Sequence, residues 1–144
     1  MIEIENTHNR RSGRVLPMAW LRELTELRER AAVPVHMDGA RIFNAAAALG
    51  VPAAEVARYA DSVQFCLSKG LAAPVGSIVT GGAEIVERVR RQRKLLGGAM
   101  RQSGVIAAAG LVALETMIDR LPEDHARARR LAEHLAEIEG VSID

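Results

Sequence analysis

The sequence predicts an α/β fold in which a mostly parallel sheet is flanked by helices. Short apolar segments rich in β-branched residues alternate with longer segments whose apolar residues recur at helical spacing. The order strand, helix, strand, helix, strand builds right-handed crossovers between parallel strands. With 144 residues, the chain is long enough for one domain with a buried core.

The first elements follow from short-range signals. Residues 2–5 read as a short strand, and the polar residues 6–14 that follow form a turn. Residues 17–31 are expected to form a helix, because Pro17 is tolerated in a first helical turn and leucines recur on one face. Residues 33–37 are apolar and β-branched, which predicts a buried strand.

The middle of the chain continues the alternation. A helix over residues 40–49 is expected to end at Gly50, and a short helix over 52–59 follows. Two further apolar runs, residues 61–67 and 76–80, are predicted to be strands.

The last part of the chain is predicted to be helical without further strands. The three expected helices cover residues 84–95, 104–118 and 122–138. The helix over 104–118 is apolar nearly all round, so we expect it to be buried on more than one side. A sheet of three or four strands is too small to cover it, which predicts assembly with other protein.

Composition excludes several classes of function. A net charge of +1 and a pI near 8.0 argue against nucleic acid as the main partner, and aromatic residues make up only 3%. No apolar run is long enough to span a membrane, so no membrane partner is expected. The single Cys66 and a start without signal-peptide character predict a cytoplasmic location.

Two charged residues stand at predicted strand ends, where open α/β sheets collect ligands. Asp38 closes one strand and Lys69 follows the next, in a loop of small residues. This pair suits pyridoxal phosphate, whose aldehyde bonds to a lysine amine and whose ring nitrogen is held protonated by a carboxylate. The alternative is a solvated lysine in a loop between two strands.

Four sequence blocks sharpen this interpretation. They are Glu5-Asn-Thr-His-Asn9, His36-Met-Asp-Gly-Ala-Arg-Ile-Phe-Asn-Ala45, Leu67-Ser-Lys-Gly-Leu71 with Ala73-Pro-Val-Gly-Ser77, and Arg93-Lys-Leu-Leu-Gly-Gly-Ala-Met-Arg-Gln102. Their identity and order resemble the low-specificity L-threonine aldolase family, within the aromatic amino-acid β-eliminating lyases, over nearly the whole chain.

The resemblance implies part of the large domain of a fold-type I pyridoxal-phosphate enzyme. Such an enzyme cleaves L-threonine or L-allo-threonine to glycine and acetaldehyde. Lys69 matches the family's Schiff-base lysine, and Asp38 matches the aspartate that pairs with the pyridine nitrogen. Arg41 matches an arginine that reaches the cofactor and the substrate carboxylate. His8 matches a histidine beside the substrate β-hydroxyl.

The resemblance also implies a homodimer or homotetramer whose active sites draw residues from more than one subunit. Lys94 and Arg101 match basic positions that face the neighbouring subunit's phosphate. The alternative for the basic run around them is a solvated helix face. No metal ligand set is expected.

We expect residues 1–144 to be a single partial domain, the central segment of the family fold, with the N- and C-terminal parts missing. Two alternative functions remain open. One is a non-catalytic remnant that keeps the motifs without the activity. The other is a pyridoxal-phosphate lyase that acts by β-elimination on another amino acid.

Overall fold

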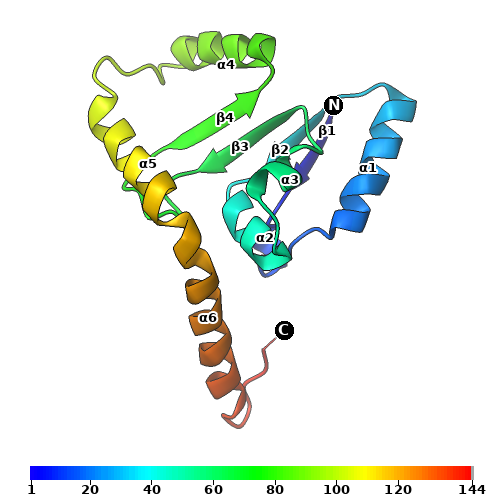
Figure 1. Ribbon diagram of the computed structural model, residues 1–144, viewed down its shortest axis with the longest axis vertical. Helices are drawn as coiled ribbons and strands as arrows, with labels where there is room; N and C mark the ends of the chain where they lie inside the picture. The colour runs from blue at the N-terminus through cyan, green and yellow to red at the C-terminus, as the bar shows by residue number, and fades with distance from the viewer. Residues whose placement is uncertain (144) are drawn as a thin grey trace.

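The computed structural model describes residues 1–143, and it confirms the predicted α/β class. Four strands form one sheet in the order β1-β2-β3-β4 (Figure 1). The strands are β1 (Ile2–Glu5), β2 (Val35–Asp38), β3 (Ser62–Cys66) and β4 (Ser77–Gly81). The first three are parallel, and β4 runs antiparallel to β3. The sheet is therefore mostly parallel, as the element order predicts.

Two crossovers place their helices on the same face of the sheet. The first contains α1 (Met18–Ala31), and the second contains α2 (Ile42–Leu49) and α3 (Ala53–Ala57). The main core joins one face of the strands to these helices. Its buried residues are Ile4, Leu21, Leu24, Val35, Met37, Ile42, Ala46, Val56 and Val63. Burial of this apolar face supplies most of the driving force for the arrangement.

The second half of the chain is helical, as predicted, with boundaries that differ by a few residues. It consists of α4 (Ala83–Leu95), α5 (Gly104–Thr116) and α6 (Leu121–Ala136), with short 3-10 turns at Asn9–Arg11 and Ile118–Arg120. Pro17 lies just outside α1 as its N-cap, since its φ of −62° is combined with an extended ψ of 145°. Gly50 ends α2 with a positive φ of 67°, as expected.

A second apolar cluster attaches the loop after β3 to α5 and α6. Its buried members are Leu67, Leu71, Ala73, Ala113 and Leu121. Phe43 and Phe65 pack edge to face, with ring centroids 5.3 Å apart, and contact this cluster. Phe65 and Phe43 also pack against the main core, so the two clusters are continuous.

The other face of the parallel strands is polar. Because side chains alternate along a strand, the residues between the core positions point away from α1, α2 and α3. They form two rows across the sheet, Glu3–His36–Ser62 and Glu5–Asp38–Gln64. His36 Nδ1 lies 2.9 Å from Ser62 Oγ, which gives this histidine a structural role.

Within the single chain, most of the surface of α5 is exposed, as expected if the sheet is too small to cover this helix. Only Gly110 and Ala113 of this helix are buried, while Val105 is 83% exposed and Leu111 60% exposed. The reason is geometric, because α5 contacts the rest of the fold along one narrow stripe. Leu95, Leu96 and Met100, before α5, are also exposed. None of the helices in the described part of the chain is long and apolar enough to cross a membrane.

Two leucines of α1 test the position of the core. Leu21 is fully buried and Leu27 is 46% exposed on the same helix. We expect Leu21→Ala to lower the free energy of unfolding by about 2–5 kcal/mol, because it leaves a cavity against the sheet. Leu27→Ala should cost less than about 1 kcal/mol. Chemical denaturation of both variants measures the difference, and equal losses would place the core elsewhere.

Candidate functional site

The three parallel strands end at the same edge of the sheet. Glu5 and Asp38 are partners in register at the ends of β1 and β2, and Asp38 is paired with Gln64 of β3. The chain leaves β3 at Cys66 and enters the loop that carries Lys69. The structure therefore places Asp38 and Lys69 at the carboxyl ends of adjacent parallel strands, the region where open α/β sheets bind ligands.

Asp38 is half-buried on the polar face of the sheet. Its Oδ1 atom accepts a hydrogen bond of 3.0 Å from the backbone N–H of Ala40, which fixes the carboxylate at the entrance to α2. Its Oδ2 atom makes no hydrogen bond within residues 1–143. Gly39 allows this close turn, because a Cβ there would lie 3.0 Å from Val63 Cγ1 and 3.1 Å from the carbonyl oxygen of Gln64.

His8 lies in a compact turn after β1. Its backbone N–H donates to the carbonyl oxygen of Arg14 at 3.0 Å, and the Glu5 carboxylate accepts from the backbone N–H of Asn9 at 3.1 Å. His8 Nε2 lies 3.5 Å from Glu5 Oε2. The turn thus holds the imidazole close to the carboxyl end of β1.

Two buried polar atoms of this turn have no hydrogen-bond partner in the described chain. They are His8 Nδ1 and Asn6 Nδ2. Asn6 is fully buried, and its Oδ1 accepts from the backbone N–H of Leu16 at 3.2 Å. Buried polar atoms are normally paired, so these two point to a group that completes the site.

Arg41 connects α2 to the His8 turn. Arg41 is the N-cap residue of α2, and its guanidinium donates to Asn9 Oδ1 at 3.3 Å. Asn9 follows His8 directly, so this hydrogen bond joins the segment after β2 to the segment after β1. The structure brings Arg41, His8 and Asp38 into one region. Arg41 is half-buried.

A cavity of about 460 Å³ opens beside β1 in the same region. Its lining residues are Glu3, Ile4, Glu5, His8, Leu16, Trp20 and Asp38. His8 and Asp38 therefore share a cavity, as two groups that act on one ligand must. No group of three or more histidine, cysteine, aspartate or glutamate residues within residues 1–143 is arranged to hold a metal ion.

The Lys69 loop is closed by backbone hydrogen bonds and anchored by buried leucines. The N–H of Leu67 donates to the Gly76 carbonyl oxygen at 2.9 Å, and the N–H of Ala73 donates to the Leu67 carbonyl oxygen at 3.0 Å. Leu67 and Leu71 are 7% and 2% exposed. Lys69 lies between these two anchors with its side chain exposed. The loop therefore presents the amine on a fixed backbone.

Lys69 lines a different cavity from Asp38. This second cavity, of about 280 Å³, lies between the Lys69 loop and the start of α6. Its lining residues are Lys69, Gly70, Ala72, Met117, Arg120, Leu121, Glu123, Asp124 and Arg127. The two cofactor candidates thus lie at neighbouring strand ends without lining the same cavity.

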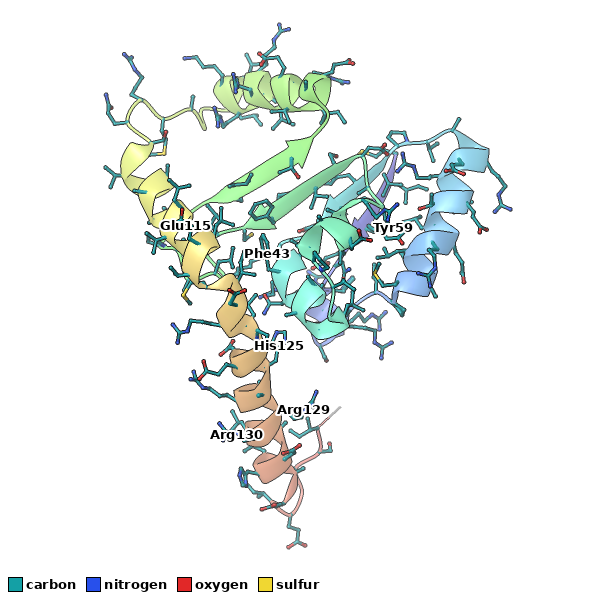
Figure 2. All side chains as sticks on the ribbon, viewed as in Figure 1. Phe43, Tyr59, Glu115, His125, Arg129 and Arg130 are labelled. Atoms are coloured by element: carbon teal, nitrogen blue, oxygen red, sulfur yellow. The ribbon has the colours of Figure 1, made fainter. Side chains whose placement is uncertain are left out.

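Gly70, next to the lysine, has a use that sequence reasoning missed. A Cβ at Gly70 would lie 2.6 Å from Asn44 Oδ1 and 3.3 Å from Leu121 Cδ2. The small residue therefore accommodates side chains of α2 and α6. Sequence reasoning also gave no role to His125, which lies near the start of α6 (Figure 2). Its Nε2 lies 3.1 Å from Asn44 Nδ2. The pairing joins residues 81 positions apart, so no local pattern could have found it.

Lys94 and Arg101 lie on segments that follow the antiparallel strand β4. Lys94 is in the last turn of α4, and Arg101 is in the segment that connects α4 to α5. Because β4 is antiparallel to β3, α4 begins at the opposite end of the sheet from the Lys69 loop (Figure 1). Both side chains are exposed. Neither residue lines the cavity that Asp38 and His8 share or the cavity that Lys69 lines.

Comparisons with known proteins agree on one family. The family described as Beta-eliminating lyase matches residues 1–144. The chain is 46% identical over 144 residues to low-specificity L-threonine aldolase 1 of Arabidopsis thaliana, covering 100% of the chain and 40% of that protein. It is 47% identical over 137 residues to the low specificity L-threonine aldolase of Escherichia coli K12, covering 95% of the chain and 40% of that protein.

The fold agrees with solved structures as well. A putative L-allo-threonine aldolase from Listeria monocytogenes superimposes with a TM-score of 0.90 at 22% identity, over 96% of the chain and 38% of that protein. A putative aromatic amino acid β-eliminating lyase/threonine aldolase from Exiguobacterium gives a TM-score of 0.89 at 24% identity. The chain spans about 40% of the length of the curated relatives that it matches.

Proposed function

Because the chain belongs to the β-eliminating lyase family, we propose that it carries the cofactor-lysine segment of a pyridoxal-phosphate-dependent lyase of the L-threonine aldolase type. The single observation that carries the proposal is the position of Lys69 and Asp38 at the ends of adjacent parallel strands. Identities of 46% and 47% to proteins named low-specificity L-threonine aldolases support the substrate class, L-threonine and L-allo-threonine.

The residues present fit this cofactor. The amine of Lys69 is exposed on an anchored loop, where it can bond to the cofactor aldehyde. Asp38 Oδ2 has no partner within residues 1–143 and can accept a hydrogen bond from a protonated ring nitrogen. The buried, unpaired Nδ1 of His8 lies beside the cavity that Asp38 lines. When bound, pyridoxal phosphate supplies an acceptor for the electron pair at the substrate α-carbon.

The chain's own residues would supply the remaining steps. In retro-aldol cleavage the Cα–Cβ bond breaks while the β-hydroxyl loses its proton and becomes an aldehyde. His8, or a water that it orders, would take that proton. The Arg41 guanidinium would bind the substrate carboxylate, since its hydrogen bond to Asn9 already brings it to the His8 turn. Asp38 would keep the proton on the ring nitrogen.

Assembly would complete the site. We propose a homodimer or homotetramer in which Lys94 and Arg101 approach the cofactor phosphate of a neighbouring subunit. The exposure of both side chains supports this assignment. The large exposed apolar residues of α5 support a buried contact there. The single Cys66, which forms no disulfide, supports a cytoplasmic location.

Cofactor attachment can be tested cleanly, because the chain has only two lysines, Lys69 and Lys94. After pyridoxal phosphate is added and the adduct is reduced with borohydride, peptide mapping should find the label mainly on Lys69. Lys69→Arg should abolish most labelling, and the matched Lys94→Arg should not. Equal labelling of both lysines would show that Lys69 is an ordinary solvated amine.

Turnover can be tested in a chimera. Residues 1–144 would replace the matching segment of the Escherichia coli relative, which shares 47% identity over 137 residues. We expect release of glycine and an aldehyde, and Asp38→Asn should lower turnover roughly 100-fold or more, because the ring proton is no longer held. An inactive but folded chimera that binds the cofactor would favour the non-catalytic alternative. Release of a 2-oxo acid and ammonium instead would favour β-elimination.

The isolated chain should not behave as a monomer. Val105, Leu111 and Val112 of α5 are more than half exposed, and such surface is normally covered. We expect light scattering to show dimers or larger species at low micromolar concentration. A double change of Leu111 and Val112 to Ser should shift the distribution toward the monomer. If the unaltered chain is a monodisperse monomer, the exposed apolar surface of α5 does not need to be covered by another protein.

A further inference from the structure

Asn44 stands where three separate segments meet. It belongs to α2, it contacts the Lys69 loop at Gly70, and it faces α6 through His125. Figure 2 shows His125 on the side of α6 that is turned toward α2. The amide nitrogen of asparagine can only donate, so this 3.1 Å contact has His125 Nε2 as its acceptor. This contact sets the direction of the Asn44 amide.

The Asn44 amide packs closely against the backbone of Gly70, the residue that follows Lys69. A Cβ at Gly70 would lie 2.6 Å from Asn44 Oδ1 and 3.3 Å from Asn44 Nδ2, much closer than ordinary van der Waals contact. Leu121 Cδ2 would lie 3.3 Å from the same Cβ, and Leu121 is itself buried. The space beside the Gly70 backbone, where a Cβ would lie, is therefore occupied by side chains of α2 and α6.

The same helix also continues directly from the Asp38 turn. Asp38 is fixed to Ala40, and α2 begins at Ile42. Asn44 thus connects the segment that carries Asp38 to the loop that carries Lys69. The two candidate cofactor groups come from different strands, and this contact joins them through side-chain packing.

We propose that Asn44 is a positioning residue: its amide, oriented by His125, packs against Gly70 and fixes the backbone that presents Lys69. This inference rests on the proposed function in one respect, namely that Lys69 is the cofactor lysine. His125 acts indirectly, through Asn44: as the hydrogen-bond acceptor, it keeps the Asn44 amide oriented toward the Lys69 loop. Neither residue is placed against substrate or cofactor.

A double-mutant cycle tests the packing without any cofactor. Gly70→Ala should lower Tm by on the order of 5 °C, because the new methyl group meets the Asn44 amide. In the Asn44→Ala background the same change should lower Tm clearly less, because the amide that the new methyl group would meet is absent. Gly104→Ala is the matched control, because a Cβ there meets nothing within 4 Å. Its effect should be the same in both backgrounds.

Relative reactivity of the two lysines tests the positioning role. With pyridoxal phosphate and borohydride, Asn44→Ala should reduce the Lys69-to-Lys94 labelling ratio several-fold, while Lys94 serves as the internal reference. His125→Ala should act in the same direction. His125→Gln should restore the ratio, because the glutamine side-chain oxygen can accept from Asn44 Nδ2. A purely structural role would leave this ratio unchanged in any variant that folds.

Several outcomes would overturn the assignment of Asn44. They are an equal cost of Gly70→Ala in both backgrounds, an unchanged labelling ratio in folded Asn44→Ala, and a failure of His125→Gln to differ from His125→Ala. Acetylation of the two lysines with acetic anhydride gives a second ratio that needs no cofactor. If pyridoxal phosphate does not favour Lys69 in the unaltered chain, the proposed function fails, while the acetylation ratio and the cycle still decide on Asn44.

Discussion

Burial of one apolar face of β1, β2 and β3 against α1, α2 and α3 is the constraint on which the other features depend. It holds the helices of both crossovers on the same side of the sheet, and these crossovers return the chain so that the three strands run parallel. Parallel strands end at a common edge, so residues from distant parts of the sequence arrive together. The His8 turn, Asp38 and the Lys69 loop are neighbours for this reason. The topology of the sheet, more than any single contact, therefore brings these groups together.

The sequence predicts this framework well because its signals are local. Helical spacing of leucines, β-branched runs and glycine stops are each contained in a short window, and the observed elements agree within a few residues. The candidates Lys69, Asp38, Arg41 and His8 were found from blocks of neighbouring residues. Their positions relative to one another depend on contacts between residues far apart in the sequence, such as the hydrogen bond from Arg41 to Asn9.

Other features could not be predicted, and the physical reasons differ. Gly70, the residue after Lys69, leaves space that Asn44 of α2 and Leu121 of α6 occupy, and both lie far from it in the sequence. His125 looked like one polar residue among many in α6, since its partner lies on another helix. The apolar sequence of α5 indicates that the helix needs to be buried, but it does not specify which protein surface covers it. Val105 remains exposed here.

The alternation of side chains in β2 has a consequence for how this segment can change over evolution. Val35 and Met37 face the helices, so His36 and Asp38 must face the opposite side. Insertion or deletion of one residue within the strand would exchange the two sets. It would bring a carboxylate into the apolar core and leave a methionine where a cofactor ring is expected. Strand length should therefore drift less than strand sequence, because the same hydrophobic pattern that folds the sheet also sets the direction of Asp38.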